Sequence, residues 1–292
     1  MNPNCKIVDT FPDFLKYWEK ASSLSLDKQI QLWRSQYMQK YRELLEKQLQ
    51  CYRNADVDWK EIARKIFPKF KFRISLMRTA RKNILAVYRS IWKRALHRLG
   101  VDFDTVFVVY VGLGCGAGWA TTYDGKPSVL LGLENIAEEK WHTKAKLKGL
   151  ISHEIGHLTH MKWREEWETF EKNEEDPLFL LYSEGFAQRC EHLILERESW
   201  RMAPNREWLL WCRQNRKFLA KEFLTRLKEQ RSVNDFFGSW FDIQGKSQTG
   251  YFLEYIFIQE LEKIYSLKEI SLLKIEEIKK LALQFLESEA HM

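Results

Sequence analysis

The sequence has few cysteines, and no two of them form a Cys-x-x-Cys pair. The five cysteines are odd in number and widely spaced: Cys5, Cys51, Cys115, Cys190 and Cys212. Small secreted domains held by disulfides have dense, even-numbered cysteine patterns instead. The N-terminal residues also lack a basic start followed by an apolar run, so we expect no signal peptide. Both absences predict a reduced, cytoplasmic protein without a disulfide framework.

One long segment, residues 105–123, contains no charged side chain and is long enough to cross a membrane as a helix. Its second half, however, has glycine at every second position from Gly112 to Gly118. The β-branched run before these glycines predicts a buried strand over 106–111 followed by a glycine loop. The same loop matches Gly-x-Gly-x-x-Ala, but turn-forming residues follow it where a dinucleotide-binding fold requires a helix.

Acidic residues are absent from 62–101, a stretch that contains 12 Lys and Arg. Residues 1–100 hold 22 Lys and Arg against 9 Asp and Glu, whereas the remainder of the chain is net negative. Such a run is typical of the solvated basic face of an amphipathic helix, or of a surface for an anionic partner. The chain contains no established nucleic-acid-binding motif that would decide between these interpretations.

The hydrophobic pattern predicts an α+β, predominantly helical fold. The first 66 residues have the spacing of helices throughout, and helical spacing returns over 77–99. Alternating apolar residues predict a strand over 70–76, and further strands are expected over 106–111 and 128–133, with a turn at Asp124-Gly125. The predicted C-terminal helices cover 143–162, 177–198, 205–229, 248–265 and 269–288, with Asp176-Pro177 starting the second of them.

This pattern divides the chain into a helical N-terminal region, residues 1–66, and a larger domain, residues 67–292. The larger domain has a sheet part over 67–136 and a helical part over 137–292. At 292 residues, 45% of them hydrophobic and 12 of them Trp, the chain has ample material for a packed core. No repeat or low-complexity linker separates the two parts.

The segment "HEIGH" carries the strongest chemical signal. On a helix, His153 and His157 lie within about 40° of each other and one turn apart, so both imidazoles can reach one metal ion. Leu147, Ile151, Ile155 and Leu158 fall on roughly the opposite side and can anchor the helix in the core. Glu154 lies beside the histidine face, where it can touch a ligand of the metal without coordinating it.

A zinc hydrolase needs a third protein ligand, and Glu184 is the best candidate downstream. It stands in the apolar stretch "PLFLLYSEGFA", where an uncompensated carboxylate would be costly and a cation would relieve the cost. The small residues Gly185 and Ala187 allow close approach to the histidine helix. The alternative interpretation of Glu184 is a solvated carboxylate on a helix surface. His160 lies two turns from His153, which favours a packing or supporting role over coordination.

"HEIGH" followed by "SEGFA" resembles the gluzincin branch of zinc metallopeptidases, and most closely the uncharacterised predicted zinc proteases of the peptidase-MA kind. The resemblance implies a zincin-like core in residues 67–292 and Zn²⁺ held by His153, His157 and Glu184. It also implies Glu154 as the base that activates the zinc-bound water, with a peptide or protein as substrate. The segment 128–136 corresponds to the strand that pairs with the substrate backbone.

Gluzincins also use a Tyr or His to stabilise the oxyanion, and Tyr251 is the candidate for this role, a buried core aromatic being the alternative. If the enzyme were an aminopeptidase, Glu134 could hold the free amine of the substrate. The first 66 residues carry no part of the resemblance.

Two other hypotheses remain at this point. Peptide deformylases are similar in taking a third ligand from a cysteine in a loop before His-Glu-x-x-His, a position that Cys115 could fill. The context of Cys115 lacks the deformylase motif, and Glu184 offers an alternative ligand. The other hypothesis is a nucleic-acid-binding protein without catalytic activity, in which the basic stretch binds the partner and the metal site is structural.

Overall fold

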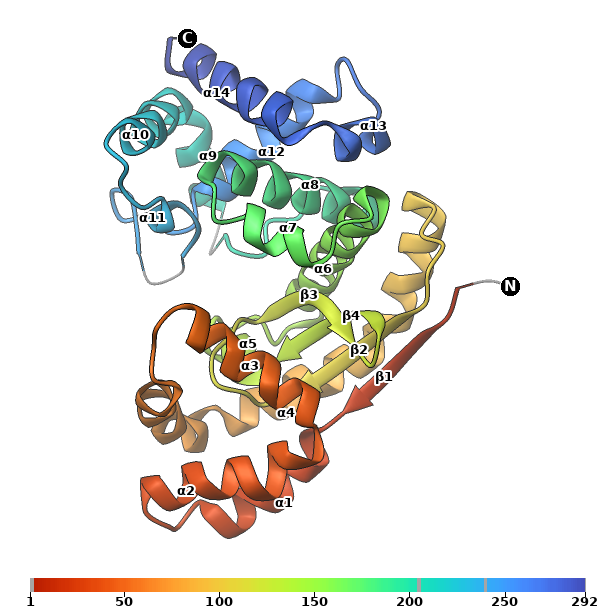
Figure 1. The fold of residues 1–292 in the computed structure, drawn as a ribbon, viewed down its shortest axis with the longest axis vertical. Coiled ribbons are helices and arrows are strands. Elements are labelled where there is room, and N and C mark those ends of the chain that lie inside the picture. Colours follow the sequence, from red (N-terminus) through yellow and green to blue (C-terminus); the bar gives the residue numbers. More distant parts are fainter. Residues whose placement is uncertain (1–2, 204–205, 239–240, 292) are drawn as a thin grey trace. The chain divides into compact units, whose positions relative to one another are not determined.

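A computed structural model of the chain describes residues 3–203, 206–238 and 241–291 (Figure 1). Two compact units make up the chain, Met1–Glu154 and Ile155–Met292. The first unit contains β1 (Cys5–Asp9), α1 (Phe11–Ala21), α2 (Leu26–Leu32), the short helical turns η1 (Trp33–Tyr37) and η2 (Met38–Lys40), α3 (Arg42–Asn54), α4 (Trp59–Leu99), β2 (Thr105–Tyr110), β3 (Gly118–Tyr123), β4 (Lys126–Gly132) and α5 (Leu133–Glu138). The division falls inside α6 (Lys144–Arg164).

The four strands form one mixed sheet in the order β1-β2-β4-β3. β1 and β4 run parallel to β2 on its two sides, while β3 runs antiparallel to β4. Asp124 and Gly125 join β3 to β4 with φ angles of 52° and 65°, as a two-residue hairpin turn requires. The predicted strands over 106–111 and 128–133 and the predicted turn are confirmed. β3 was not predicted, although Trp119, Thr121, Thr122 and Tyr123 favour strands, because the glycines before it and the turn residues after it dominate the pattern.

Helix α4 is one continuous element of 41 residues, so the predicted strand over 70–76 is wrong. Phe70 is fully buried, but Phe72, on the same face of the predicted strand, is 74% exposed. Burial along α4 instead follows the helical period. Packing of the buried face of α4 against the rest of the unit outweighs both the local alternation of apolar residues and the unfavourable Pro68 in the helix interior. The helix ends at Gly100, which adopts φ 66°, as expected.

The N-terminal residues are not helical throughout, because residues 5–9 form β1 at the edge of the sheet. The helical spacing over 26–53 does not give one helix, because it is interrupted at η1 and η2, where Tyr37 is fully buried. The Tyr37 hydroxyl accepts a hydrogen bond from the Val111 amide at 3.0 Å and lies 2.5 Å from Thr10 Oγ1. These contacts attach the N-terminal helices to the sheet, a long-range arrangement that periodicity does not indicate.

The second unit is helical apart from one isolated bridge within the described residues. It contains the C-terminal part of α6 and α7 (Glu168–Asn173), α8 (Pro177–Leu195), α9 (Arg206–Gln214), α10 (Arg216–Lys228), α11 (Asn234–Phe237), α12 (Gly250–Leu261), α13 (Leu267–Leu272) and α14 (Ile275–His291). The predicted helix over 205–229 is two helices, which meet at Asn215, and residue 205 lies outside the described residues. The expected helix over 269–288 is likewise divided into α13 and α14.

The fold is therefore α+β and predominantly helical, as predicted, with a small mixed sheet. The sheet core is formed by β2, all of whose residues are buried, and α4 covers one face through Tyr88 and Trp92, which pack against Phe107. Within the described ranges, no helix combines the length and the apolar composition needed to cross a membrane. The uncharged segment that could mimic such a helix is β2 followed by the glycine loop, as expected.

Candidate metal centre

Helix α6 carries both histidines of the candidate site. The helix is buried on every side from Gly149 to Met161. The predicted anchoring residues Leu147, Ile151, Ile155 and Leu158 are all fully buried. Their burial holds one side of α6 in the core, so that His153 and His157 project together from the other side, one turn apart.

Helix α8 approaches α6 closely at Gly156. A Cβ atom at this position would lie 2.8 Å from Cys190 Cβ and 2.9 Å from Ala187 Cα, which is too close for any side chain. The small residues at 156 and 187 thus set the distance between the two helices, and Glu184 lies about one turn before the contact. The prediction that Ala187 permits close approach is confirmed. Gly185 instead faces α12, where a Cβ would overlap the Glu254 carbonyl.

The start of α8 is as predicted. Asp176 caps the helix, and its carboxylate accepts hydrogen bonds from the amides of Leu178 and Phe179 at 2.9 and 3.2 Å. Pro177 occupies the first helical position, where its missing N–H has no cost. The cap fixes where α8 begins and therefore which residues face α6.

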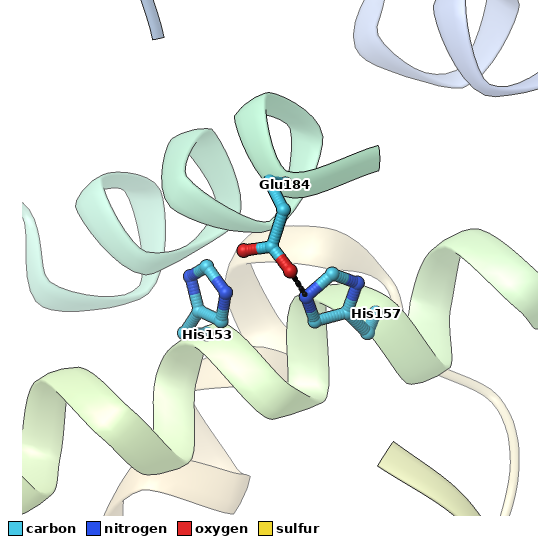
Figure 2. A group of neighbouring side chains, drawn as sticks. All are labelled: His153, His157 and Glu184. Carbon is cyan, nitrogen blue, oxygen red and sulfur yellow. Dashed lines mark ion pairs between the residues drawn. The ribbon is translucent and has the colours of Figure 1, made fainter. Parts of the chain in front are cut away.

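The side chains of His153, His157 and Glu184 converge, with one ligand atom of each within 4.8 Å of the other two. Figure 2 shows the Glu184 carboxylate reaching from α8 towards both imidazole rings. Glu184 Oε1 lies 3.4 Å from His157 Nε2. Ligand atoms held about 2.1 Å from a tetrahedral zinc ion lie about 3.4 Å from each other, so this pair already has the spacing of a zinc site.

The donor set and its burial also fit a divalent cation. The side chains of His157 and Glu184 are only 9% and 17% exposed. Removing a carboxylate from water is costly unless positive charge compensates it, and two neutral imidazoles with one carboxylate are a common donor set for zinc. Within the described residues, His153, His157 and Glu184 form the group of His, Cys, Asp or Glu side chains whose ligand atoms lie close enough together to hold one metal ion.

Glu154 is 6% exposed and lies against the sheet of the first unit. A side chain at Gly118, the first residue of β3, would overlap the Glu154 carboxylate, so the absence of a Cβ there makes the space that this carboxylate occupies. β3 is an edge strand, whereas β4 is paired on both sides. The expectation that 128–136 pairs with a substrate backbone is therefore wrong, because the backbone hydrogen bonds of β4 are already used by β2 and β3.

His160 packs among aromatic rings rather than joining the ligand group. It is fully buried, stacks on Phe186 with ring centroids 4.1 Å apart, and lies 2.8 Å from the Tyr182 hydroxyl. Burial first, and the positive charge of Arg164 second, hold the pKa of His160 well below its ordinary value. A neutral His160 then orients Tyr182, whose hydroxyl donates to the Ile270 carbonyl at 2.7 Å. The predicted packing role is confirmed.

The other sequence candidates have contacts of their own. Cys115 belongs to no group of possible ligands among the described residues, and its thiol donates to the Gln48 carbonyl at 3.9 Å. Glu134 is fully buried and accepts a hydrogen bond from the Gly114 amide, so it is not placed to hold a substrate amine. Tyr251 is half-buried in the first turn of α12, with the Arg201 guanidinium 5.3 Å from its ring centroid.

Sequence reasoning missed Glu254, which lies on α12 where that helix meets Gly185. Its side chain is fully buried, and neither carboxyl oxygen has a hydrogen-bond partner among the described residues. Burial first, and the nearby carboxylate of Glu184 second, raise the pKa of Glu254 well above its ordinary value. The sequence held one signal, since Glu254 stands in the apolar stretch "YFLEYIFI" as Glu184 stands in its own, but it does not say which residue Glu254 meets.

Comparison of the chain with protein-family models, with curated proteins and with solved structures finds no match.

Proposed function

We propose that this chain is a zinc-dependent hydrolase of peptide bonds, with His153, His157 and Glu184 as the metal ligands. The observation that carries the proposal is the convergence of these three donors from two helices, with Glu154 adjacent to the first histidine. Three protein ligands leave a fourth position in a tetrahedral site. When bound, zinc supplies a Lewis acid that polarises a carbonyl and makes water acidic near neutral pH.

Glu154 is the proposed general base. Its carboxylate accepts the proton of the attacking water and passes it to the amine that leaves when the peptide bond breaks. Its place beside Gly118 associates it with the edge strand β3. An extended peptide could add to that edge through backbone hydrogen bonds, which would bring a peptide carbonyl near Glu154 without requiring a particular side chain. Tyr251 is the candidate for stabilising the oxyanion.

The test combines metal analysis with cleavage of a peptide library. We expect about one zinc per wild-type chain, and loss of both metal and cleavage in His153→Ala, His157→Ala and Glu184→Gln. Glu154→Gln keeps the zinc but lowers turnover by roughly 100- to 10,000-fold, because it removes only the proton transfer. His97→Ala and Glu19→Gln, which change exposed residues of α4 and α1, are the matched controls and leave both quantities unchanged.

Two results would contradict the proposal. Unchanged cleavage by Glu154→Gln would remove the proposed base, and full metal content in Glu184→Gln would remove the third ligand. If the Glu184 variant keeps its metal and Cys115→Ser loses it, the deformylase-like arrangement replaces the one proposed here.

A further inference from the structure

Helix α4 carries a row of exposed cations on the side that faces away from the core. The row, called the basic ridge below, consists of Lys71, Arg78, Lys82, Arg89 and Lys93, all of them exposed. At 100° per residue these five positions fall within about 60° of one another around the helix axis. They span 22 residues, which is about 33 Å along a helix. Arg78, Lys82, Arg89 and Lys93 lie in the helix predicted over 77–99, and the continuity of α4, which the sequence did not predict, adds Lys71 to their line.

Several other cations of α4 pair with acidic residues elsewhere in the first unit. Arg81 pairs with Asp9 at 2.6 Å, and Lys69 and Arg73 pair with Glu138 at 3.3 and 2.7 Å. No ion pair of a ridge residue is found in the part of the chain that the structure describes. Since 62–101 contains no acidic residue, the part of α4 that carries the ridge offers it no counter-charge. The ridge is therefore a linear positive surface held in place by a rigid helix.

We propose that the basic ridge binds the phosphate backbone of a nucleic-acid duplex, independently of base sequence. The length of the ridge, about 33 Å, is close to one helical turn of duplex DNA, so a duplex lying against it can bring phosphates of both strands near its cations. Each neutralised phosphate releases counterions, so the affinity should fall steeply with salt. This function is separate from the proposed hydrolysis and does not depend on it.

The apolar surface of α4 favours a nucleic acid over a lipid surface. Helices that lie in a membrane interface insert an apolar face beside their basic one. The apolar face of α4 is instead buried in the core of the first unit, and Phe72 is its one large apolar side chain that is mostly exposed. The basic ridge therefore presents a partner with a straight row of positive charges on a helix that is folded before binding.

The experiment measures binding of the full chain to a fluorescent 24-base-pair duplex, as DNA and as RNA, between 50 and 200 mM NaCl. The ridge variant carries Arg78→Glu, Lys82→Glu and Lys93→Glu. The control variant carries Lys268→Glu, Lys274→Glu and Lys280→Glu, exposed lysines of the second unit, and changes the net charge equally. For the wild type we expect a slope of log affinity against log salt of about −4 to −5, from about 0.9 per phosphate.

The ridge variant should lose about three of those slope units and at least about tenfold in affinity at 100 mM NaCl, while the control variant keeps its slope. If the Glu-substituted ridge variant fails to fold, a variant with Arg78→Gln, Lys82→Gln and Lys93→Gln replaces it. This neutral variant should show a smaller loss of slope and of affinity in the same direction. Equal losses in the ridge and control variants would overturn the proposal. So would absence of duplex binding at 50 mM NaCl, including the case in which the wild type binds vesicles of phosphatidylserine instead.

Discussion

The two compact units place their charges differently. Met1–Glu154 contains 27 Lys and Arg against 16 Asp and Glu, a net charge of +11, and Ile155–Met292 contains 20 against 24, a net charge of −4. Among the described residues, the second unit buries more His, Arg and Glu side chains: His157, His160, Glu191, His192, Arg201, Glu254 and Glu289, against Glu134, His153 and Glu154 in the first. Surface charge costs little and is available to a partner, whereas buried charge is costly and marks a site or an internal pair.

The largest effect should come from breaking a buried pair in the second unit. Arg201 and Glu191 are 4% and 0% exposed, with Arg201 Nη1 2.7 Å from Glu191 Oε2. Glu191→Leu leaves the guanidinium buried without this carboxylate and should lower the free energy of unfolding by about 3–5 kcal/mol. Glu254→Leu, which removes a carboxyl that has no hydrogen-bond partner among the described residues, should instead raise it by about 1–3 kcal/mol.

Urea unfolding of both variants measures this contrast. The double variant Glu191→Leu with Arg201→Met is the control, and it should recover most of the loss because it removes both charges together. If Glu254→Leu destabilised the chain as much as Glu191→Leu, burial of the Glu254 carboxyl without a hydrogen-bond partner would have no cost, and the prediction for Glu254 would be wrong.

A smaller, pH-dependent effect is expected from Glu134 in the first unit. Burial raises the pKa of Glu134 from 4.5 to about 7, although backbone amides of Gly112 and Gly114 donate to it. Between these values the folded chain holds a proton that the unfolded chain has released, so stability falls as the pH rises from about 4.5 to 7 and then levels off. Relative to Glu134→Gln, the wild type should lose up to about 3 kcal/mol over this range.

Urea unfolding of the wild type and Glu134→Gln at pH 5, 6 and 7.5 tests whether stability falls as the pH rises. Glu138, on the same helix, is the matched control. Burial acts to raise its pKa, but the hydrogen bond and charge of Arg73, 2.7 Å away, outweigh burial and hold the pKa below its ordinary value. Glu138→Gln should therefore lose stability relative to the wild type at pH values above the unfolded pKa. Identical pH profiles for the wild type and Glu134→Gln would contradict the prediction for Glu134.

The smallest effect should come from the basic ridge. Single substitutions such as Arg78→Gln or Lys82→Gln remove exposed charges that form no ion pair with the described residues, and should change the free energy of unfolding by no more than about 0.5 kcal/mol. Thermal unfolding followed by circular dichroism measures this change. A loss of several kcal/mol would show that the ridge stabilises the fold, and would weaken its assignment as a surface for a partner.

The candidate site was largely predictable because its pattern is local. Two histidines four residues apart share a helix face whatever the rest of the chain does, and Asp176-Pro177 marks the start of α8 by cap chemistry alone. Glu184 could be proposed because a carboxylate in an apolar stretch is costly. The same reasoning applies to Glu254 in "YFLEYIFI", but neither its neighbours nor those of Arg201 indicate which helix the side chain contacts.

Local pattern failed where distant residues decide the structure. The alternation over 70–76 predicts a strand, yet packing of Phe67, Phe70 and the residues that follow makes α4 continuous. Residues 118–123 become β3 only by pairing with β4, and residues 5–9 become β1 only by pairing with β2. In each case the hydrogen-bond partner or the buried face comes from residues outside the window that the sequence pattern covers.

By itself, the sequence determined the helical character of the second unit, the spacing of His153 and His157, and the excess of positive charge in 62–101, since each depends on neighbouring residues. Only the tertiary structure decided that Glu184 meets both imidazoles, that β3 and not β4 lies at the sheet edge, and that Lys71 joins the row of cations on α4. The physical reason is that burial and strand pairing depend on which distant segments meet, and the buried face of α4 is what extends the helix back to Lys71.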